Sequence, residues 1–196
     1  MANKFPLAIA LLAGGKSVRM GRDKAQLPLG DVTFLEHIVG LALKVAPRVL
    51  VVGRRQPCLW TLTQVEFMLD ETPGLGPLGA LQTALRKEES VLVVACDLPL
   101  LTPFALEWLM EQGSACSAPH GIIVENGGQC EPLFSIYHRA CLPLIESNLA
   151  EGRRSMHALI RAGDFSFAQA PPEIAALLVN VNTPEEWAAL TARADW

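Results

Sequence analysis

An uninterrupted apolar run, VLVVA at residues 91–95, constrains the fold more than any other feature of this sequence. A strand with one solvated face alternates apolar and polar residues, whereas a strand covered on both faces does not. Short, largely apolar segments also occupy residues 7–12, 48–53 and 65–69, so we expect four strands, of which those at 7–12 and 91–95 are buried. The first run is too short for a membrane helix, and the dense basic residues after it argue against a signal peptide.

Helix-length segments separate these runs. In TFLEHIVGLALKVA, Thr33 and Glu36 have capping-box spacing and the apolar residues recur with helical period. A second helix is predicted to begin at GPLG, from residue 76, and a third at Thr102-Pro103, reaching Met110. Strand and helix in alternation are typical of a parallel α/β sheet with right-handed crossovers.

The C-terminal half has a less regular pattern. It predicts strands at residues 121–125 and 132–137, antiparallel through NGGQ, a helix at 138–149, a strand at 177–182 and a helix from Thr183. We therefore predict one α/β domain over residues 1–196. It would have a Rossmann-like, mostly parallel sheet with helices on both faces and a mixed C-terminal part.

Composition narrows the function classes. About half of the residues are apolar, which suits a sizeable core, and the net charge of −4 gives no overall attraction to nucleic acid or anionic membrane. The five cysteines are odd in number and form no C-x-x-C pair. We interpret them as reduced thiols of a cytosolic protein, because a disulfide framework or a zinc site needs paired or regularly spaced ligands.

The most informative loop is LLAGGKSVRMGRDK, residues 11–24, which follows the first predicted strand. Ligands of open α/β sheets bind beyond the carboxyl ends of the strands. The loop is not a P-loop, because the position that needs the first glycine is Ala10, and it also lacks G-x-G-x-x-G spacing.

Gly14 and Gly15 still allow a close backbone approach to phosphate. Cations surround them at Lys16, Arg19, Arg22 and Lys24. The alternative is a glycine-rich turn with a solvated basic face.

Polar residues follow two other predicted strands and lie on a third. Asp97 comes directly after VVAC, where a carboxylate suits Mg²⁺, although it can also simply begin the turn before Pro99. Asp70 lies in a Gly-Pro-rich segment that can shape a base pocket or be only a polar loop. Asn180 and Asn182 would share one face of a strand, as metal or acceptor ligands or as ordinary polar residues.

The whole string LAGGKSVRMGRDK, residues 12–24, resembles the signature L-A-G-G-x-S-x-R-M-G-x-D-K of the molybdenum cofactor guanylyltransferases, with every fixed position present. Further matches are DETPGLGPLGAL, ACDLPLL, EPLFSIYH, EGRRSM and NVNTPEEW, in the family's order, so the resemblance covers essentially the whole chain. Cytidylyl relatives usually carry Ala where this chain has Gly14, which favours the guanylyl branch.

The resemblance implies a nucleotidyltransferase fold, Mg²⁺ as cofactor and GTP as substrate. The terminal phosphate of molybdopterin would attack the α-phosphorus, pyrophosphate would leave, and a guanine dinucleotide would result. The acceptor is already an anion, so no protein nucleophile is required. A molybdoenzyme or a cofactor-handling protein would be the macromolecular partner. The alternatives are a cytidylyl or sugar-phosphate transferase on the same fold, and a non-catalytic nucleotide-binding adapter.

The resemblance also implies roles for particular residues. Catalysis would fall to Lys24, Arg19 and Asp97, with Asp97 also the metal ligand and Asp70 on the guanosine side. The backbone at the nucleotide would be that of Leu12, Ala13, Gly14 and Gly15, and the acceptor side would comprise Arg153, Arg154, Asn180 and Asn182. One position departs from the pattern: some members carry a nucleotide-contacting Asn where this chain has Gly53. The sequence leaves open whether Arg54 or Arg55 compensates.

Overall fold

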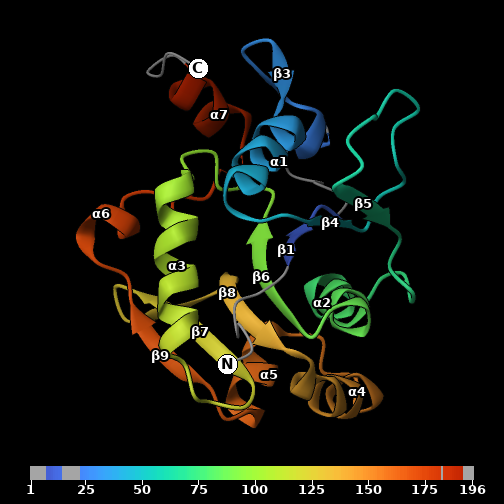
Figure 1. The fold of residues 1–196 in the computed structure, drawn as a ribbon, viewed down its shortest axis with the longest axis vertical. Helices are drawn as coiled ribbons and strands as arrows, with labels where there is room; N and C mark the ends of the chain where they lie inside the picture. The colour runs from blue at the N-terminus through green and yellow to red at the C-terminus, as the bar shows by residue number, and fades with distance from the viewer. Residues whose placement is uncertain (1–7, 15–22, 182, 192–196) are drawn as a thin grey trace.

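A computed structural model describes residues 8–14, 23–181 and 183–191 of the chain, and its centre is a seven-stranded sheet of order β5-β4-β1-β6-β8-β7-β9 (Figure 1). The strands are β1 (Ala8–Leu12), β4 (Val49–Val52), β5 (Val65–Met68), β6 (Ser90–Ala95), β7 (Gly121–Asn126), β8 (Gln129–His138) and β9 (Ser166–Gln169). Strands β5, β4, β1 and β6 are mutually parallel, β8 runs antiparallel to β6 and β7, and β9 is parallel to β7. The mostly parallel sheet with a mixed C-terminal part is confirmed.

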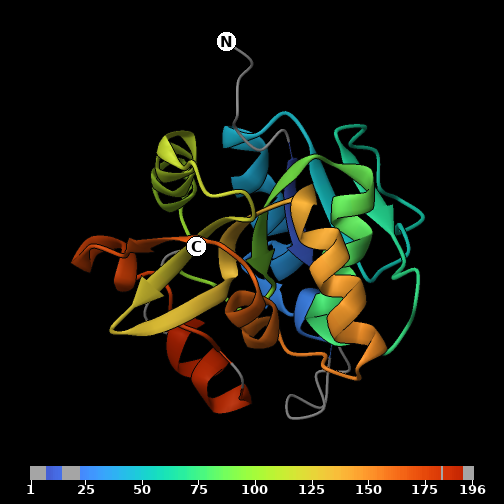
Figure 2. The same cartoon turned by 90° about the horizontal axis from the view of Figure 1, so that it is seen from below.

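Helices cover both faces of this sheet (Figures 1 and 2). One face carries α1 (Phe34–Val45), α3 (Pro103–Ala115) and α6 (Pro172–Ala175), and the other carries α2 (Gly76–Lys87), α4 (Leu142–Ala150) and α5 (Met156–Ala162). The smaller elements are η2 (Lys24–Gln26), the hairpin β2 (Pro28–Leu29) and β3 (Val32–Thr33), η3 (Arg139–Cys141) and α7 (Pro184–Thr191).

The buried strands explain why their sequences do not alternate. On β1, Ile9 and Leu11 pack into the apolar cluster beneath α1 and α3, whereas Ala10 and Leu12 pack into the cluster beneath α2. The residues of β6 divide between the two clusters in the same way. Since each strand must supply apolar side chains to both clusters, a continuous apolar run is the pattern that this sheet needs.

The predicted starts of α1 and α3 are confirmed by their capping contacts. At the start of α1, the Glu36 backbone N–H donates to Thr33 Oγ1 at 3.2 Å, and the Thr33 backbone N–H donates to the Glu36 carboxylate at 2.6 Å. Thr102 caps α3 by accepting from the Ala105 N–H at 3.4 Å. These contacts satisfy backbone donors that the first helical turn leaves unpaired.

The predicted strand at residues 177–182 is wrong over its described part, because residues 177–181 form no strand. Leu178 and Val181 are buried, so the apolar signal is real, but it reflects packing of a turn and an irregular segment. The Val181 N–H donates to the carbonyl of Asp97 at 3.0 Å, outside any ladder. The edge of the sheet beyond β7 is occupied instead by β9, which the sequence did not indicate.

Within the described part of the chain, no helix combines the length and apolar character that crossing a bilayer requires. All five cysteines are free thiols, and Cys96, Cys116 and Cys141 are buried. The interpretation of these residues as mostly core positions is therefore confirmed for the three buried ones, while Cys58 is exposed.

Candidate active site

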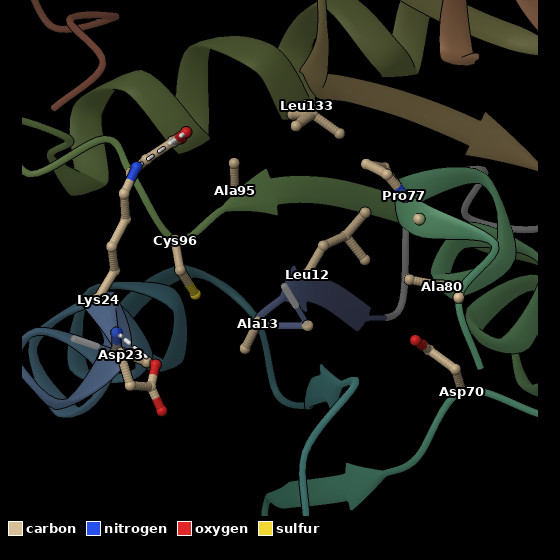
Figure 3. Close-up of a pocket in the computed structure, with 15 residues that line it drawn as sticks. Leu12, Ala13, Asp23, Lys24, Asp70, Pro77, Ala80, Ala95, Cys96 and Leu133 are labelled. Atoms are coloured by element: carbon tan, nitrogen blue, oxygen red, sulfur yellow. Dashed lines mark hydrogen bonds and ion pairs between the residues drawn. The ribbon is translucent and has the colours of Figure 1, made fainter. Parts of the chain in front are cut away.

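The carboxyl ends of β1, β4, β5 and β6 meet at one edge of the sheet, where a cavity of about 640 Å³ opens. Strand β1 lies between β4 and β6, so the loop after β1 starts at the point where the strand order reverses. The cavity is lined by Leu12, Ala13, Gly14, Asp23, Lys24, Ala25, Asp70, Gly74, Gly76, Pro77, Ala80, Ala95, Cys96, Asp97 and Leu133 (Figure 3). Of the predicted nucleotide-site residues, the structure thus brings together Leu12, Ala13, Gly14, Lys24, Asp70 and Asp97.

Two glycines pack their backbones together beside this cavity. A Cβ atom on Gly53 would lie 2.5 Å from the Cα atom of Gly14, a separation that real structures do not tolerate. Gly53 also has a φ of +91°, in the region that favours glycine. The sequence therefore departs from the family's Asn at a position where this backbone has no room for a side chain.

Lys24 reaches the cavity from η2. The Asp23 carboxylate accepts from the Ala25 N–H at 3.2 Å and caps this short helix. Lys24 Nζ lies 4.0 Å from Asp97 Oδ2, and the two side chains are only 16% and 24% exposed (the dashed ion pair from Lys24 in Figure 3). A cation and a carboxylate at this depth act in a less polar medium than water, so their charges act strongly on a bound phosphate.

The surroundings of Asp97 satisfy its carboxylate only in part. Burial raises the pKa of Asp97 above its ordinary value, and the Lys24 cation offsets part of this rise. Its Oδ1 atom is buried and has no hydrogen-bond donor among the described residues. The negative charge of Asp97 in turn helps burial to raise the pKa of Glu131, on β8. A buried carboxylate oxygen without a donor suits a bound cation.

No group of three or more His, Cys, Asp or Glu side chains is arranged to hold a metal ion in the described ranges. This agrees with Mg²⁺ chemistry, since Mg²⁺ usually binds through one or two carboxylates together with substrate phosphates. Asp97 fits that role because its buried Oδ1 atom has no hydrogen-bond donor in the part of the chain that the structure describes.

Asp70 lies across the cavity from Lys24 (Figure 3). Burial raises the pKa of its carboxyl group, and its Oδ1 atom is buried without a donor among the described residues. Its Oδ2 atom lies 3.5 Å from where a Cβ atom on Gly14 would be, so the carboxylate stands beside the backbone of the first loop. This side chain can therefore accept hydrogen bonds from a ligand held against that backbone.

The start of α2 forms another wall of the cavity. Gly74 and Gly76 have φ angles of +85° and +67°, which explains the glycines in PGLGPLG, and no side chain caps this helix end. The N-terminus of a helix attracts negative charge through its backbone N–H groups. Pro77 and Ala80 line the cavity from the first turns (Figure 3). The Gly-Pro turns thus shape the site, as the sequence suggested.

Some residues of the site were not indicated by the sequence. Leu133 reaches the cavity because β8 is antiparallel to β6, which brings the first half of β8 to the carboxyl edge. Asp23 was only the D of the signature, yet it accepts from Arg54, whose guanidinium also donates to the Ala13 carbonyl. The predicted hairpin was the sequence pattern from which Leu133 could have been placed. A pair that is distant in the chain, such as Asp23 and Arg54, leaves no pattern in a single sequence.

Of the predicted acceptor residues, Arg154 is the one that contacts a segment lining the cavity among the residues that the structure describes. Arg154 donates to the carbonyl of Gly74 at 3.3 Å, which places it against a lining segment, whereas Arg153 donates to Asn148 Oδ1 at 2.7 Å and to Glu151. Asn180 is exposed, and it does not lie on a strand. Gly15, Arg19 and Asn182 lie outside the described residues.

Solved structures with the same architecture define the class of protein. The molybdopterin-guanine dinucleotide biosynthesis protein A of Archaeoglobus fulgidus has a TM-score of 0.80 at 22% identity, covering 94% of this chain and 97% of its own. The 2-C-methyl-D-erythritol 4-phosphate cytidylyltransferase of Thermus thermophilus has a TM-score of 0.64 at 16% identity, over 93% and 96%. The fold is therefore that of the nucleotidyltransferases.

Sequence comparison then gives the family. Residues 9–170 match the MobA-like NTP transferase domain, and the chain belongs to this family. A protein of Carboxydothermus hydrogenoformans named "Probable molybdenum cofactor guanylyltransferase" is 33% identical over 92% of this chain and 93% of its own. A protein of the same name from Mycobacterium tuberculosis is 38% identical over 81% of each chain. The resemblance noted in the sequence is confirmed.

Proposed function

We propose that this enzyme transfers GMP from GTP to the terminal phosphate of molybdopterin, forming a guanine dinucleotide and releasing pyrophosphate. The observation that carries the proposal is the Lys24–Asp97 pair, largely buried, at the carboxyl edge of a nucleotidyltransferase sheet. The named guanylyltransferases at 33% and 38% identity support guanine as the base.

The chain's own groups would act by positioning and by charge. The backbone of Ala13 and Gly14, kept free of side chains by the Gly14–Gly53 packing, would lie against the nucleotide. Lys24 would neutralise the charge that grows on the α-phosphate in the transition state, and Asp70 would accept hydrogen bonds on the guanosine side. Such pre-positioned charges supply most of the rate in phosphoryl transfer.

Asp97 would hold Mg²⁺ through Oδ1, the carboxylate oxygen that has no donor among the described residues. The ion would supply positive charge to the phosphate oxygens of GTP when it is bound. Asp97 would also keep Lys24 extended into the cavity through their ion pair. Gly15 and Arg19 enter this proposal through the family signature, with Arg19 on the leaving pyrophosphate.

The acceptor side would be the part of the rim at Gly74. Arg154, which contacts the Gly74 carbonyl, would bind the pterin phosphate, with Arg153, Asn180 and Asn182 nearby. Arg153 is paired with Glu151 and Asn148, so its charge is partly committed within the protein. The five free thiols support a cytoplasmic location, because disulfides are rare in that compartment.

The fold does not choose the base, since a cytidylyltransferase shares it. The candidate functions can be distinguished by incubating the purified protein with molybdopterin, Mg²⁺ and one of the four NTPs at a time, and measuring pyrophosphate release. Pyrophosphate release with GTP, dependent on molybdopterin, is expected. Release with CTP alone would make the protein a cytidylyltransferase, and tight GTP binding without release would make it an adapter.

A further inference from the structure

Arg54 joins the two ends of the segment that carries the family signature. Its Nε atom donates to the carbonyl of Ala13 at 3.1 Å, and its Nη2 atom donates to the carboxylate of Asp23. Ala13 follows β1, and Asp23 precedes η2, so one guanidinium from the end of β4 contacts both sides of residues 14–22. The Arg54 side chain is only 18% exposed.

The base of Arg54 is fixed by its neighbours. The backbone N–H groups of Gly53 and Arg54 both donate to the carbonyl of Met68, at 2.8 and 3.3 Å, which ties this turn to β5. The Gly14–Gly53 packing fixes the same turn against the loop after β1. Arg54 therefore projects from a turn that is held from two sides.

Asp23, which accepts the hydrogen bond from Arg54, is the residue directly before Lys24 in the chain. The Asp23 carboxylate that receives the guanidinium also caps η2 through the Ala25 N–H at 3.2 Å, and the Asp23 carbonyl accepts from the Gln26 N–H at 3.0 Å. Lys24 is the first residue of that helix and extends to Asp97. The Asp23 carboxylate thus accepts from Arg54 and also caps η2. It therefore fixes the position of the Lys24 backbone, from which the lysine side chain extends.

We propose that Arg54 is a positioning residue for nucleotidyl transfer, which pins Ala13 to Asp23 and thereby holds Lys24 at the reacting phosphate. It does not replace the family's Asn as a base contact, because its Nε and Nη2 atoms are committed to Ala13 and Asp23 and it does not line the cavity. Arginine suits this role because its planar fork can address two acceptors, which a lysine ammonium on a flexible stem does poorly. The inference rests on the proposed function, since it assigns Lys24 to the α-phosphate.

The kinetic test compares Arg54→Gln and Arg54→Lys with Arg55→Gln, which removes the same charge from the exposed neighbouring residue. We expect both Arg54 variants to lower kcat about 10- to 100-fold, as displaced catalytic groups do, with KM for GTP changed less than about threefold. Arg55→Gln should keep wild-type kcat. A rise in KM for GTP with kcat unchanged would instead make Arg54 a binding contact and overturn the proposal.

A double-mutant cycle tests the route through the lysine. If Arg54 acts by placing Lys24, then Arg54→Gln should have little further effect in a Lys24→Met background, because the group that it positions is absent. Full additivity of the two losses would contradict the proposal. A kcat close to the wild-type value in Arg54→Lys would also contradict the proposal, since it would show that only the positive charge at residue 54 matters.

Amide hydrogen exchange tests the geometry without relying on turnover. Loss of the bridge should raise the exchange rates of the Ala25 and Gln26 amides about tenfold relative to Arg55→Gln, while the amides of β6 stay unchanged. Equal exchange rates of these amides in Arg54→Gln and Arg55→Gln would show that Arg54 does not hold Asp23 and η2 in place. A wild-type protein that releases no pyrophosphate would refute the proposed function, and the exchange result would still decide whether Arg54 holds this segment.

Discussion

The two sides of the proposed site are built in different ways. On the nucleotide side, Gly14, Gly53, Asp70 and Asp97 each follow one of four neighbouring parallel strands, so the sheet register fixes where each backbone stands. On the acceptor side, Arg154 follows helix α4 and is tied to the site by one hydrogen bond, to Gly74. A site held by strand ends is pre-organised, whereas one held by loop side chains can adapt to its ligand.

Burial follows the same division. Lys24 and Asp97 are mostly shielded from solvent, while Arg153 and Arg154 are exposed. We therefore expect changes on the nucleotide side to act on kcat, and changes on the acceptor side to act on KM for molybdopterin.

The largest effect is expected for Asp97→Asn. This change keeps the shape of the side chain but removes the charge that would hold Mg²⁺, and losses of about 10³-fold in kcat are typical for a central electrostatic group. Steady-state pyrophosphate release measures it. Asp31→Asn, which removes a charge from the exposed β2–β3 turn, is the control and should match the wild type. Equal turnover in the two variants would remove Asp97 from the metal site.

The same variant makes a prediction about pH and stability. Because burial raises the pKa of Asp97 above its ordinary value of 3.8, the folded state holds this proton to higher pH than the unfolded state does. The contribution of Asp97 to stability therefore falls as pH rises through that window, and it is unfavourable at pH 7. Asp97→Asn should melt at a higher temperature than the wild type at pH 7, with the difference vanishing in strong acid. A lower melting temperature at pH 7 would mean that the Lys24 ion pair outweighs the burial of the charge.

Lys24→Met should lower kcat about 10²-fold, somewhat less than Asp97→Asn, because Mg²⁺ would still be bound. Single-turnover measurements with saturating GTP separate this loss from weaker binding. Lys44→Met, on the exposed surface of α1, is the matched control. If Lys24→Met changed only KM for GTP, Lys24 would be a ground-state contact and the transition-state role would be wrong.

Gly53→Asn restores the residue that some family members carry, and we expect it to do harm. Its Cβ atom would meet the backbone of Gly14, so the two loops would separate, lowering kcat about tenfold and stability by about 1–3 kcal/mol. Gly128→Asn is the matched control, since Gly128 has a φ of +80° but nothing within 4 Å of an added Cβ atom. Equal stability losses in the two variants would show that backbone conformation alone matters at residue 53.

The smallest effect is expected for Arg154→Gln. A single exposed cation at the rim should raise KM for molybdopterin about fivefold and leave KM for GTP unchanged, because exposed charges interact weakly through water. Arg161→Gln, an exposed position on α5, serves as the control. If Arg154→Gln affected GTP rather than molybdopterin, the assignment of this rim to the acceptor would be wrong.

The strand-built side of the site was also the side that could be predicted from the sequence. The largely apolar segments located β1, β4, β5 and β6, and Asp70 and Asp97 came next to two of them in the chain. Parallel strands bring their carboxyl ends to one edge, so short-range patterns were enough to gather these residues.

The remaining errors concern contacts that have no local pattern. Residues 177–181 are mostly apolar, and Leu178 and Val181 are buried, but burial alone does not distinguish a strand from an irregular segment. Strand β9 is only four residues long, SFAQ, and is specified by its pairing with β7. The link from Arg54 to Asp23 joins residues that are far apart in the chain, which spacing rules do not reach.

The central claim is that the α-phosphate of GTP moves to molybdopterin at this sheet edge. The most direct measurement follows the label from [α-³²P]GTP and from [γ-³²P]GTP in parallel reactions with molybdopterin and Mg²⁺. We predict that the α label appears in the pterin dinucleotide and the γ label in pyrophosphate, with both signals lost in Asp97→Asn. Appearance of the γ label as inorganic phosphate, with no label in the pterin product, would contradict the account.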